Sequence, residues 1–561
     1  MPPPRSALAA ILASALAAPA LGASVPVRAR NGMVSSQNGI ASQIGVEVLA
    51  AGGNAVDAAV ATAFALAVVH PEAGNIGGGG FLLLRGPGGV SFYDFREQAP
   101  AGASPTMFLV DGRYDPVRHH RSALSVGVPG TVAGLYQAWH DNGRRPWKDL
   151  LRPAIVLAHE GFTVSDGLAR GLRGALPRLT ASPAALAQFS RAGVPYETGE
   201  LLQQEELART LGRIAELGPA GFYEGETASL IERELRARGG LVTREDLKRY
   251  SVSRRPPLRG SYRGYEVLTA PPPSSGGTCL LQSLNVLEGY ELPAMGFASA
   301  AYVHHLAEAL RRAFADRARY LGDPGFVKGL NLERLVSKDY AAALRRTIRE
   351  DKASVSSPSS FEWPAESADT THFSVVDGEG GAVALTYTLE DSYGSGIVVP
   401  GAGFLLNNEM GDFNAGPGLT DASGLIGTEP NLAAPGKRML SNMTPTILVK
   451  DDRAVLVVGA AGGRKIPGTV LQIVLDTVDF GMNVQEATDA PRVHHQWLPD
   501  AIFHEPFGLS SDTVEALRAR GHLVLERPAD EWSRAHGIAL RDGLLEGGSD
   551  RRKADGAAIG R

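Results

Sequence analysis

A β-hairpin with a defined register is predicted for residues 369–390. Asp-Gly and Gly-Gly within residues 377–381 supply the positive φ angles that a tight turn needs. After the turn, two sets of side chains alternate with the period of a strand that has two different faces: Val383, Leu385, Tyr387 and Leu389, and Ala384, Thr386, Thr388 and Glu390. If the loop is residues 378–380, Val376 pairs with Ala382 and the ladder places Thr370 opposite Thr388.

Thr370 begins this hairpin and is a candidate nucleophile. It follows residues 354–368, which are rich in Ser, Pro and acidic side chains and are typical of an exposed linker. A threonine hydroxyl is a poor nucleophile unless a base lies beside it. Cutting the chain before the threonine makes its own α-amino group that base. Taken alone, however, Thr370 matches an ordinary strand threonine better than a nucleophile.

Several ordered blocks of sequence carry a family resemblance. Upstream these are GNIGGGGF (74–81), DFREQAP (94–100), SVGVPGTVAGL (125–135) and APPPSSGG (270–277). Downstream they are DTTHFSVVD (369–377), LTYTLEDSYGSGIVVPGAGFLLNNEMGDF (385–413), PGKRMLSNMTPT (435–446) and GAAGGRKIPGTVLQ (459–472). From about residue 30 onward the chain closely resembles the γ-glutamyltranspeptidases. The resemblance implies an α+β fold of the N-terminal-nucleophile hydrolase type, a four-layer αββα sandwich with extra helices from the large subunit.

The resemblance also implies a self-cleaving enzyme. Thr370 would attack the carbonyl of Asp369 and divide the chain into a large subunit, residues 24–369, and a small subunit, residues 370–561, which together form one αββα heterodimer. Thr370 would then take the γ-glutamyl group of glutathione or a related compound as an ester and pass it to water, an amino acid or a peptide. Thr388 would assist the nucleophile, and the backbone N–H groups of Gly462 and Gly463 would form the oxyanion hole.

By the same resemblance, three charged residues recognise the donor substrate. Arg96 would grip its α-carboxylate, because a planar guanidinium forms two parallel hydrogen bonds with a carboxylate. Glu409 and Asp412 match positions that hold the α-amino group, where a carboxylate beside an ammonium is electrostatically favourable.

The chain departs from well-studied members of the family at the rim of the predicted site. Glu390 replaces an asparagine, and is expected either to add an anionic partner for the amine or to turn away from the pocket. Ser441 and Asn442 replace a serine pair that binds the substrate carboxylate, and an asparagine amide can still donate there. Ser423 stands where some bacterial members place an aromatic lid residue, so a more open acceptor side is expected.

Residues 1–23 have the layout of a secretory signal peptide, with Arg5, a short apolar run and small residues before Ser24. The alternative is an uncleaved N-terminal anchor. The expected location is therefore periplasmic or secreted, with no stable membrane span. The 561 residues carry a net charge of −5 and no basic stripe, so no nucleic-acid partner is expected. With only one cysteine, no intramolecular disulfide is possible.

Other chemistries find little support in the sequence. No serine has glycine two residues before and two residues after it, as the nucleophile elbow of α/β-hydrolases requires. The glycine run at residues 74–80 lacks the ending of a phosphate loop and is assigned to backbone packing. Cys279 is expected to be a buried, inert thiol. Neighbouring histidines such as His304 and His305 point in different directions on a helix, so no metal site is predicted. No organic cofactor is predicted either.

Two alternatives to the γ-glutamyl enzyme stay open. The first is a related acylase of altered specificity, such as a cephalosporin or glutaryl acylase. An acyl group without an amino-acid head would leave Arg96, Glu409 and Asp412 unpaired, which argues against it. The second alternative is an unprocessed, inactive relative that binds γ-glutamyl compounds without cleaving them.

Overall fold

The computed structural model describes residues 24–357, 369–419 and 427–561. The predicted signal peptide, most of the linker before Thr370, and Ser423 lie outside the described residues. None of the helices in these ranges is both long enough and apolar enough to cross a membrane.

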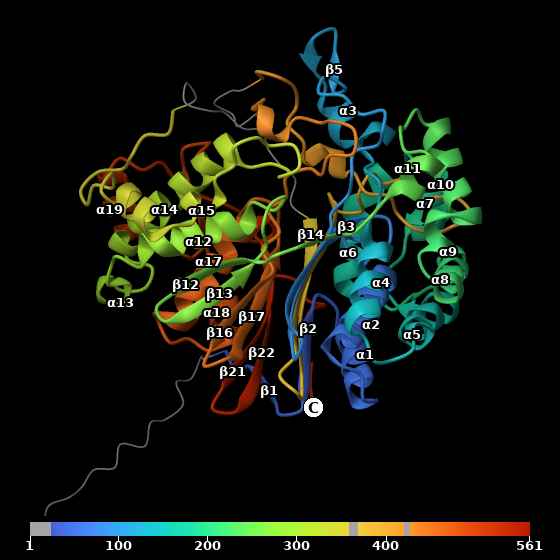
Figure 1. Cartoon of the computed structure of the whole chain (residues 1–561), viewed down its shortest axis with the longest axis horizontal. Coiled ribbons are helices and arrows are strands. Elements are labelled where there is room, and N and C mark those ends of the chain that lie inside the picture. Colours follow the sequence, from blue (N-terminus) through green and yellow to red (C-terminus); the bar gives the residue numbers. More distant parts are fainter. Residues whose placement is uncertain (1–23, 358–368, 420–426) are drawn as a thin grey trace, which may run out of the picture.

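Two seven-stranded sheets lie face to face at the centre of the molecule (Figure 1). Following its hydrogen-bonded order, the first sheet contains β1 (Val27–Ala29), β22 (Leu544–Ser549), β21 (Arg534–Arg541), β17 (Arg453–Ala461), β16 (Thr446–Lys450), β13 (Tyr265–Thr269) and β12 (Leu258–Tyr262). The second contains β11 (Ser253–Arg255), β4 (Gly89–Phe95), β3 (Gly79–Gly86), β15 (Ala382–Glu390), β14 (Asp369–Asp377), β2 (Gly32–Ser36) and β23 (Ala557–Gly560).

The predicted hairpin forms the middle of the second sheet. Strands β14 and β15 pair in antiparallel fashion with Val376 opposite Ala382 and Thr370 opposite Thr388, so the predicted register is confirmed. On its other edge β15 pairs with β3, and the two backbones approach closely. A Cβ on Gly78, just before β3, would lie 2.0 Å from the Thr388 carbonyl oxygen. A Cβ on Gly80 would lie 2.3 Å from the Thr386 carbonyl oxygen. The glycine run therefore packs backbone against backbone, as predicted.

Helices cover the outer face of each sheet (Figure 1). The helices on the side of the second sheet are α1 (Gly39–Ala50), α2 (Ala55–Val69), α4 (Thr131–Asn142), α5 (Trp147–Glu160), α6 (Asp166–Leu179), α7 (Pro183–Phe189), α8 (Glu205–Leu217), α9 (Ala220–Tyr223), α10 (Gly225–Ala237) and α11 (Arg244–Arg249). Those on the side of the first sheet are α12 (Gly276–Leu287), α13 (Leu292–Met295), α14 (Ala300–Tyr320), α15 (Leu332–Leu335), α16 (Lys338–Arg345), α17 (Lys465–Val478), α18 (Val484–Asp489) and α19 (Ser511–Ala519).

Small elements complete the described chain. Helix α3 (Pro116–His120) and the 3-10 turns η1 (Ala123–Ser125), η3 (Glu409–Asp412), η4 (Glu429–Asn431) and η5 (Ala529–Glu531) are each at most five residues long. The remaining strands are short: β5 (Leu109–Val110), β6 (Arg113–Tyr114), β7 (Phe162–Thr163), β8 (Ser190–Arg191), β9 (Val194–Pro195), β10 (Leu201–Leu202), β18 (Val493–His494), β19 (Ile502–His504) and β20 (Val524–Glu526).

Three apolar layers hold the four structural layers together. One lies between the second sheet and its helices, and another between the first sheet and α12, α14 and α17. The third fills the space between the sheets with side chains from both inner faces, among them Met33, Phe81 and Ile447. Burial of these side chains drives the sheets and helices together. The predicted αββα sandwich is confirmed.

Candidate active site

Thr370 lies at the open end of the hairpin, beside a second hydroxyl. Its Oγ1 donates to Thr388 Oγ1 over 3.4 Å, and Thr388 Oγ1 also accepts the backbone N–H of Glu390 at 2.8 Å. A register shift between Asp369 and Thr370 interrupts the ladder at the predicted cleavage site. Bulges of this kind re-aim the chain next to functional positions. Thr370 is 9% exposed and Thr388 is 2% exposed, so both hydroxyls are largely withdrawn from water.

One cavity of about 270 Å³ gathers most of the predicted site residues. Residues from widely separated parts of the chain line it: Arg96, Thr370, Thr388, Glu390, Glu409, Asp412, Ser441, Asn442, Met443, Gly463 and Ile466. Gly462 lies next to this lining rather than within it. The structure therefore places the candidate nucleophile, the candidate charged groups and one candidate oxyanion glycine around a single small volume.

The turn at Gly462 and Gly463 joins a strand to a helix. Strand β17 ends at Ala461 and α17 begins at Lys465. The backbone N–H groups of Lys465 and Ile466 bond back to the Gly462 and Gly463 carbonyls, which fixes the shape of this turn. Both glycines have positive φ angles, of 130° and 56°, which side chains rarely adopt. A Cβ on Gly462 would also lie 2.4 Å from Ser533 Oγ, so there is no room for a larger residue.

Arg96 directly follows β4, is fully buried and forms ion pairs with acidic residues. Its guanidinium contacts Glu409 and Asp412, and lies 3.4 Å from Glu97. Burial alone would lower the pKa of Arg96, but Glu409, Asp412 and Glu97 raise it above its ordinary value. Burial raises the pKa of Glu97 to about 7, because one guanidinium does not stabilise every carboxylate around it. The predicted carboxylate binder therefore contacts the predicted ammonium binders directly.

Residues of the APPPSSGG block support Ser441 and Asn442, a role that the sequence reasoning missed. The Ser275 hydroxyl lies 2.6 Å from the Ser441 carbonyl oxygen and 3.3 Å from Asn442 Oδ1. Arg317 Nε donates to the same Ser275 oxygen at 2.7 Å. The Ser275 backbone N–H bonds the Ser441 carbonyl as well. This chain of contacts holds the loop that carries two of the predicted substrate-binding residues.

His120 is a second residue that the sequence reasoning missed. Its Nδ1 lies 3.0 Å from Glu390 Oε1 in the cavity wall. The HH pair at residues 119–120 was visible in the sequence, but nothing local indicated a partner 270 positions away.

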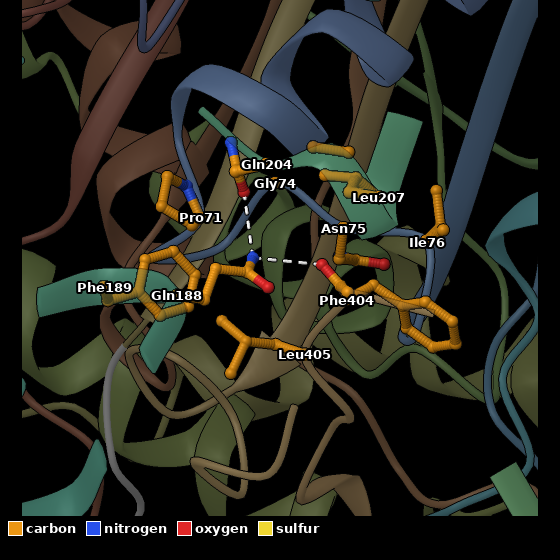
Figure 2. Close-up of a pocket in the computed structure, with 12 residues that line it drawn as sticks. Pro71, Gly74, Asn75, Ile76, Gln188, Phe189, Gln204, Leu207, Phe404 and Leu405 are labelled. Atoms are coloured by element: carbon orange, nitrogen blue, oxygen red, sulfur yellow. Dashed lines mark hydrogen bonds between the residues drawn. The ribbon is translucent and has the colours of Figure 1, made fainter. Parts of the chain in front are cut away.

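A second cavity, also of about 270 Å³, lies beside the glycine run (Figure 2). Its lining includes Phe189, Leu207, Phe404 and Leu405, and no charged residue. Gln188 Nε2 donates to the Gln204 side-chain oxygen at 3.1 Å and to the Gly403 carbonyl at 3.0 Å. Without a charged or nucleophilic group, this cavity does not carry the chemistry.

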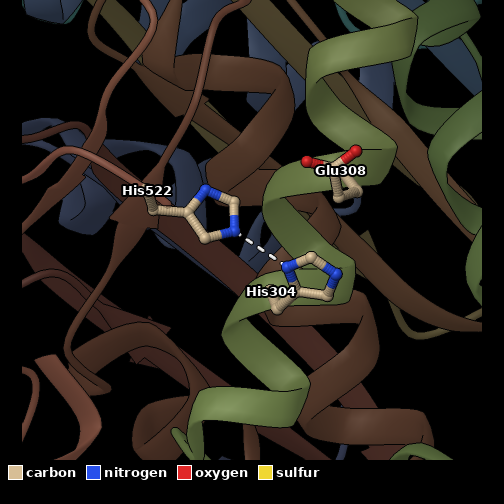
Figure 3. Close-up of side chains that lie close together, drawn as sticks. All are labelled: His304, Glu308 and His522. Carbon is tan, nitrogen blue, oxygen red and sulfur yellow. Dashed lines mark hydrogen bonds between the residues drawn. The ribbon is translucent and has the colours of Figure 1, made fainter. Parts of the chain in front are cut away.

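One cluster contains side chains that could ligate a metal: His304, Glu308 and His522 (Figure 3). His304 Nε2 lies 2.8 Å from the Arg349 carbonyl and must donate to it, so His304 Nδ1 accepts from His522 Nε2 at 2.8 Å. Burial lowers the pKa of His304, and lowers that of His522 to about 3, which keeps both imidazoles neutral. Glu308 is ion-paired with Arg311 and Arg312. These groups satisfy one another, and the two arginines oppose a cation, so we assign the cluster to packing.

Cys279 is buried in α12, as predicted. Burial raises the pKa of its thiol to about 12, so the reactive thiolate is strongly disfavoured at neutral pH.

Comparison with known proteins places this geometry in a family. The family described as Gamma-glutamyltranspeptidase matches residues 41–560. The "Glutathione hydrolase proenzyme" of Escherichia coli (strain K12) is 47% identical over 95% of this chain and 93% of its own length. The protein of the same name from Pseudomonas sp. (strain A14) is 42% identical over 99% of each chain.

A solved structure shares the whole architecture. The cephalosporin acylase from Bacillus halodurans superimposes with a TM-score of 0.85 at 29% identity, covering 98% of this chain and 99% of the acylase. Sequence and fold agree over nearly the full length, and the chain therefore belongs to the γ-glutamyltranspeptidase family.

Proposed function

We propose that this chain is a self-processing γ-glutamyl hydrolase and transferase that acts on glutathione and related γ-glutamyl amides. The observation that carries the proposal is the cavity in which Thr370 and Thr388 face Arg96 and several carboxylates. A hydroxyl nucleophile next to one cation and a group of anions suits a substrate that bears both an α-carboxylate and an α-ammonium. Membership of the family and similarity to two glutathione hydrolases support the same reaction.

In the self-cleavage step, Thr370 Oγ attacks the carbonyl carbon of Asp369. The hydroxyl proton passes to the departing amide nitrogen as the C–N bond breaks, which leaves an ester between Asp369 and Thr370. Thr388 Oγ1 accepts from the attacking hydroxyl and holds it in one orientation. Water then hydrolyses the ester, giving a chain that ends at Asp369 and another that begins with the free amine of Thr370.

In the catalytic cycle, that amine is the general base for the same hydroxyl. Thr370 Oγ attacks the γ-carbonyl of the donor, and the backbone N–H groups of Gly462 and Gly463 stabilise the oxyanion. The amine product leaves with the proton that the base took up. Water, or the amino group of an amino acid or peptide, then attacks the γ-glutamyl ester and regenerates the hydroxyl.

Donor recognition is assigned to the charged wall of the cavity. Arg96 binds the α-carboxylate, and Glu409 and Asp412 bind the α-ammonium. In this assignment, the donor's two charges replace part of the contact that these side chains make with one another in the structure. Ser441 and Asn442 donate to the carboxylate, and Glu390 adds negative charge near the ammonium.

The acylase alternative is supported by the full-length similarity to a cephalosporin acylase. It predicts that the protein cleaves a glutaryl amide in preference to the γ-glutamyl amide. The buried ion cluster around Arg96 favours the γ-glutamyl donor. A glutaryl carboxylate that bound Arg96 would bring no ammonium to replace the guanidinium beside Glu409 and Asp412.

The test combines intact-mass measurement, N-terminal sequencing and two anilide substrates. We expect two chains, the smaller beginning at Thr370, and faster release of anilide from the γ-glutamyl than from the glutaryl compound. Thr370→Ala should stay uncut. Thr371→Val is the matched control, because it removes the neighbouring buried hydroxyl, which has no hydrogen-bond partner among the residues that the structure describes; it should still be cut. A wild-type chain that stays whole would refute self-processing and favour the inactive binding relative.

For the location, we propose export directed by residues 1–23, with a mature chain that begins near Ser24. The support is the order of charge, apolar run and small residues in this segment. N-terminal sequencing of the large subunit tests it.

A further inference from the structure

Glu390 lines the active-site cavity and contacts His120, which lies outside that lining. His120 is the last residue of α3, and Glu390 is the last residue of β15. His120 Nδ1 lies 3.0 Å from Glu390 Oε1, and the side chains are 16% and 4% exposed. A buried carboxylate needs a donor to offset its loss of water, and the imidazole Nδ1–H provides one.

The surrounding backbone is shaped around this pair. A Cβ added to Gly411, in η3, would lie 2.4 Å from His120 Nδ1 and 2.5 Å and 2.7 Å from the two carboxylate oxygens of Glu390. Any side chain at position 411 would therefore displace both partners. Because η3 also carries Glu409 and Asp412, the Glu390 carboxylate is held beside the other acidic residues of the cavity.

Asn408 links the end of α3 to the end of β15. Its Nδ2 donates to the His120 carbonyl at 3.1 Å, and its Oδ1 accepts the backbone N–H of Asp391 at 3.1 Å. Its own backbone N–H bonds the Leu389 carbonyl at 3.0 Å. One asparagine side chain thus ties the end of α3 to the end of β15.

The backbone of Glu390 is also constrained on the side of the nucleophile. Its φ angle is 78°, a conformation that is uncommon for residues other than glycine, and its N–H donates to Thr388 Oγ1 at 2.8 Å. A strained conformation of this kind persists only where surrounding contacts enforce it. The same residue therefore connects the hydroxyl beside Thr370 to the charged wall.

His120 packs against a buried, neutral neighbour, His119. The rings of His119 and His120 have centroids 4.2 Å apart, and His119 is bonded to the Met410 carbonyl and the Tyr114 hydroxyl. Burial, together with His120, lowers the pKa of His119 well below its ordinary value. His119 therefore acts as a support for the His120 ring, and His120 is the imidazole that faces the carboxylate.

We infer that His120 is a positioning residue that aims the Glu390 carboxylate at the α-ammonium of the donor, and so sets the preference of this site for α-amino donors. This inference rests on the proposed function. His120 itself does not touch the reacting atoms. Its contribution is expressed in donor binding, through the direction in which Glu390 points.

The experiment measures kcat and KM for a γ-glutamyl anilide with fully cut protein. We expect His120→Ala to raise KM about tenfold, the order of a hydrogen bond to a charged group, with kcat changed less than about twofold. His120→Asn should restore KM, because its amide nitrogen takes roughly the place of Nδ1, whereas His120→Gln, whose amide reaches the place of Nε2, should not. In a Glu390→Gln background, His120→Ala should change KM less than about twofold, because the carboxylate it positions is gone.

Each other outcome contradicts the inference. An unchanged KM in His120→Ala, a loss confined to kcat, equal rescue by Asn and Gln, or an undiminished effect in the Glu390→Gln background would each refute the positioning role while leaving the proposed function in place. A wild-type protein that cuts itself but releases no anilide would overturn the proposed function, and the positioning role with it. Thermal unfolding of every variant separates a folding defect from a change in KM.

Discussion

Replacing Thr388 with valine tests whether the second hydroxyl serves the nucleophile. Valine keeps the shape of the side chain and removes one oxygen. That oxygen accepts from Thr370 Oγ1 at 3.4 Å and from the buried backbone N–H of Glu390 at 2.8 Å. The substitution therefore has two separable effects, one on the rate of self-cleavage and one on stability.

The magnitudes follow from these two contacts. The bond to Thr370 is long, and a neutral hydrogen bond contributes about 0.5–1.5 kcal/mol, so self-cleavage should slow about 2- to 10-fold. A buried N–H left without an acceptor costs about 1–3 kcal/mol, so the free energy of unfolding should fall by that amount. Thr388→Ser keeps the oxygen and loses one buried methyl group, worth about 1 kcal/mol of stability, with little expected effect on cleavage.

The assay follows freshly purified precursor over time by gel densitometry and intact mass, with thermal unfolding measured in parallel on Thr370→Ala backgrounds that cannot cut. We expect valine to slow cleavage and serine to preserve it. The Thr388 hydroxyl does not assist the nucleophile if valine matches the wild-type rate. If serine slows cleavage as much as valine does, the effect comes from packing rather than from the hydroxyl.

Further predictions concern the buried charge and the oxyanion turn. Burial raises the pKa of Glu97 from its ordinary 4.5 to about 7, so the folded state favours its protonated form. That stability is complete below about pH 4.5 and is lost as the pH rises through about 7. Each pKa unit is worth about 1.4 kcal/mol, so the change in the free energy of unfolding is about 3.5 kcal/mol. Glu97→Gln should remove this decline in the pH dependence of the unfolding free energy, and an unaltered decline would exclude Glu97 as its source. Gly462→Ala places a methyl group against Ser533 at a positive φ angle, and should lower kcat by about 10²–10³ by displacing an oxyanion donor. Gly543→Ala is the control, because it has a positive φ angle of 75° with no atom within 4 Å of the added Cβ, and should leave kcat unchanged.

The hairpin shows how far sequence reasoning reached. Alternating side chains and a glycine-rich turn predicted the pairing of Thr370 with Thr388, because both signals arise within about twenty neighbouring residues. The four-layer fold followed from the family resemblance rather than from periodicity. The glycine run was assigned to packing because it lacks the ending of a phosphate loop. Its close contact with β15 explains why glycine is needed there.

The charged residues of the cavity show what the sequence did not predict. Arg96, Glu409 and Asp412 were assigned to opposite ends of a donor, yet in the structure they form one ion cluster. His120 received no role, and neither did Ser275, although each contacts a predicted substrate-binding residue. The His304 and His522 pair likewise joins residues 218 positions apart.

Local backbone preference and ordered motifs were enough to predict the nucleophile candidate, the hairpin register and the family. The folded chain was needed to reveal the ion pairs around Arg96, the contact between His120 and Glu390, and the support of Asn442. Those contacts join strand ends, turns and helices that meet only when the two sheets stack. Side-chain partners across such distances are selected by packing geometry, which no local pattern in the chain reports.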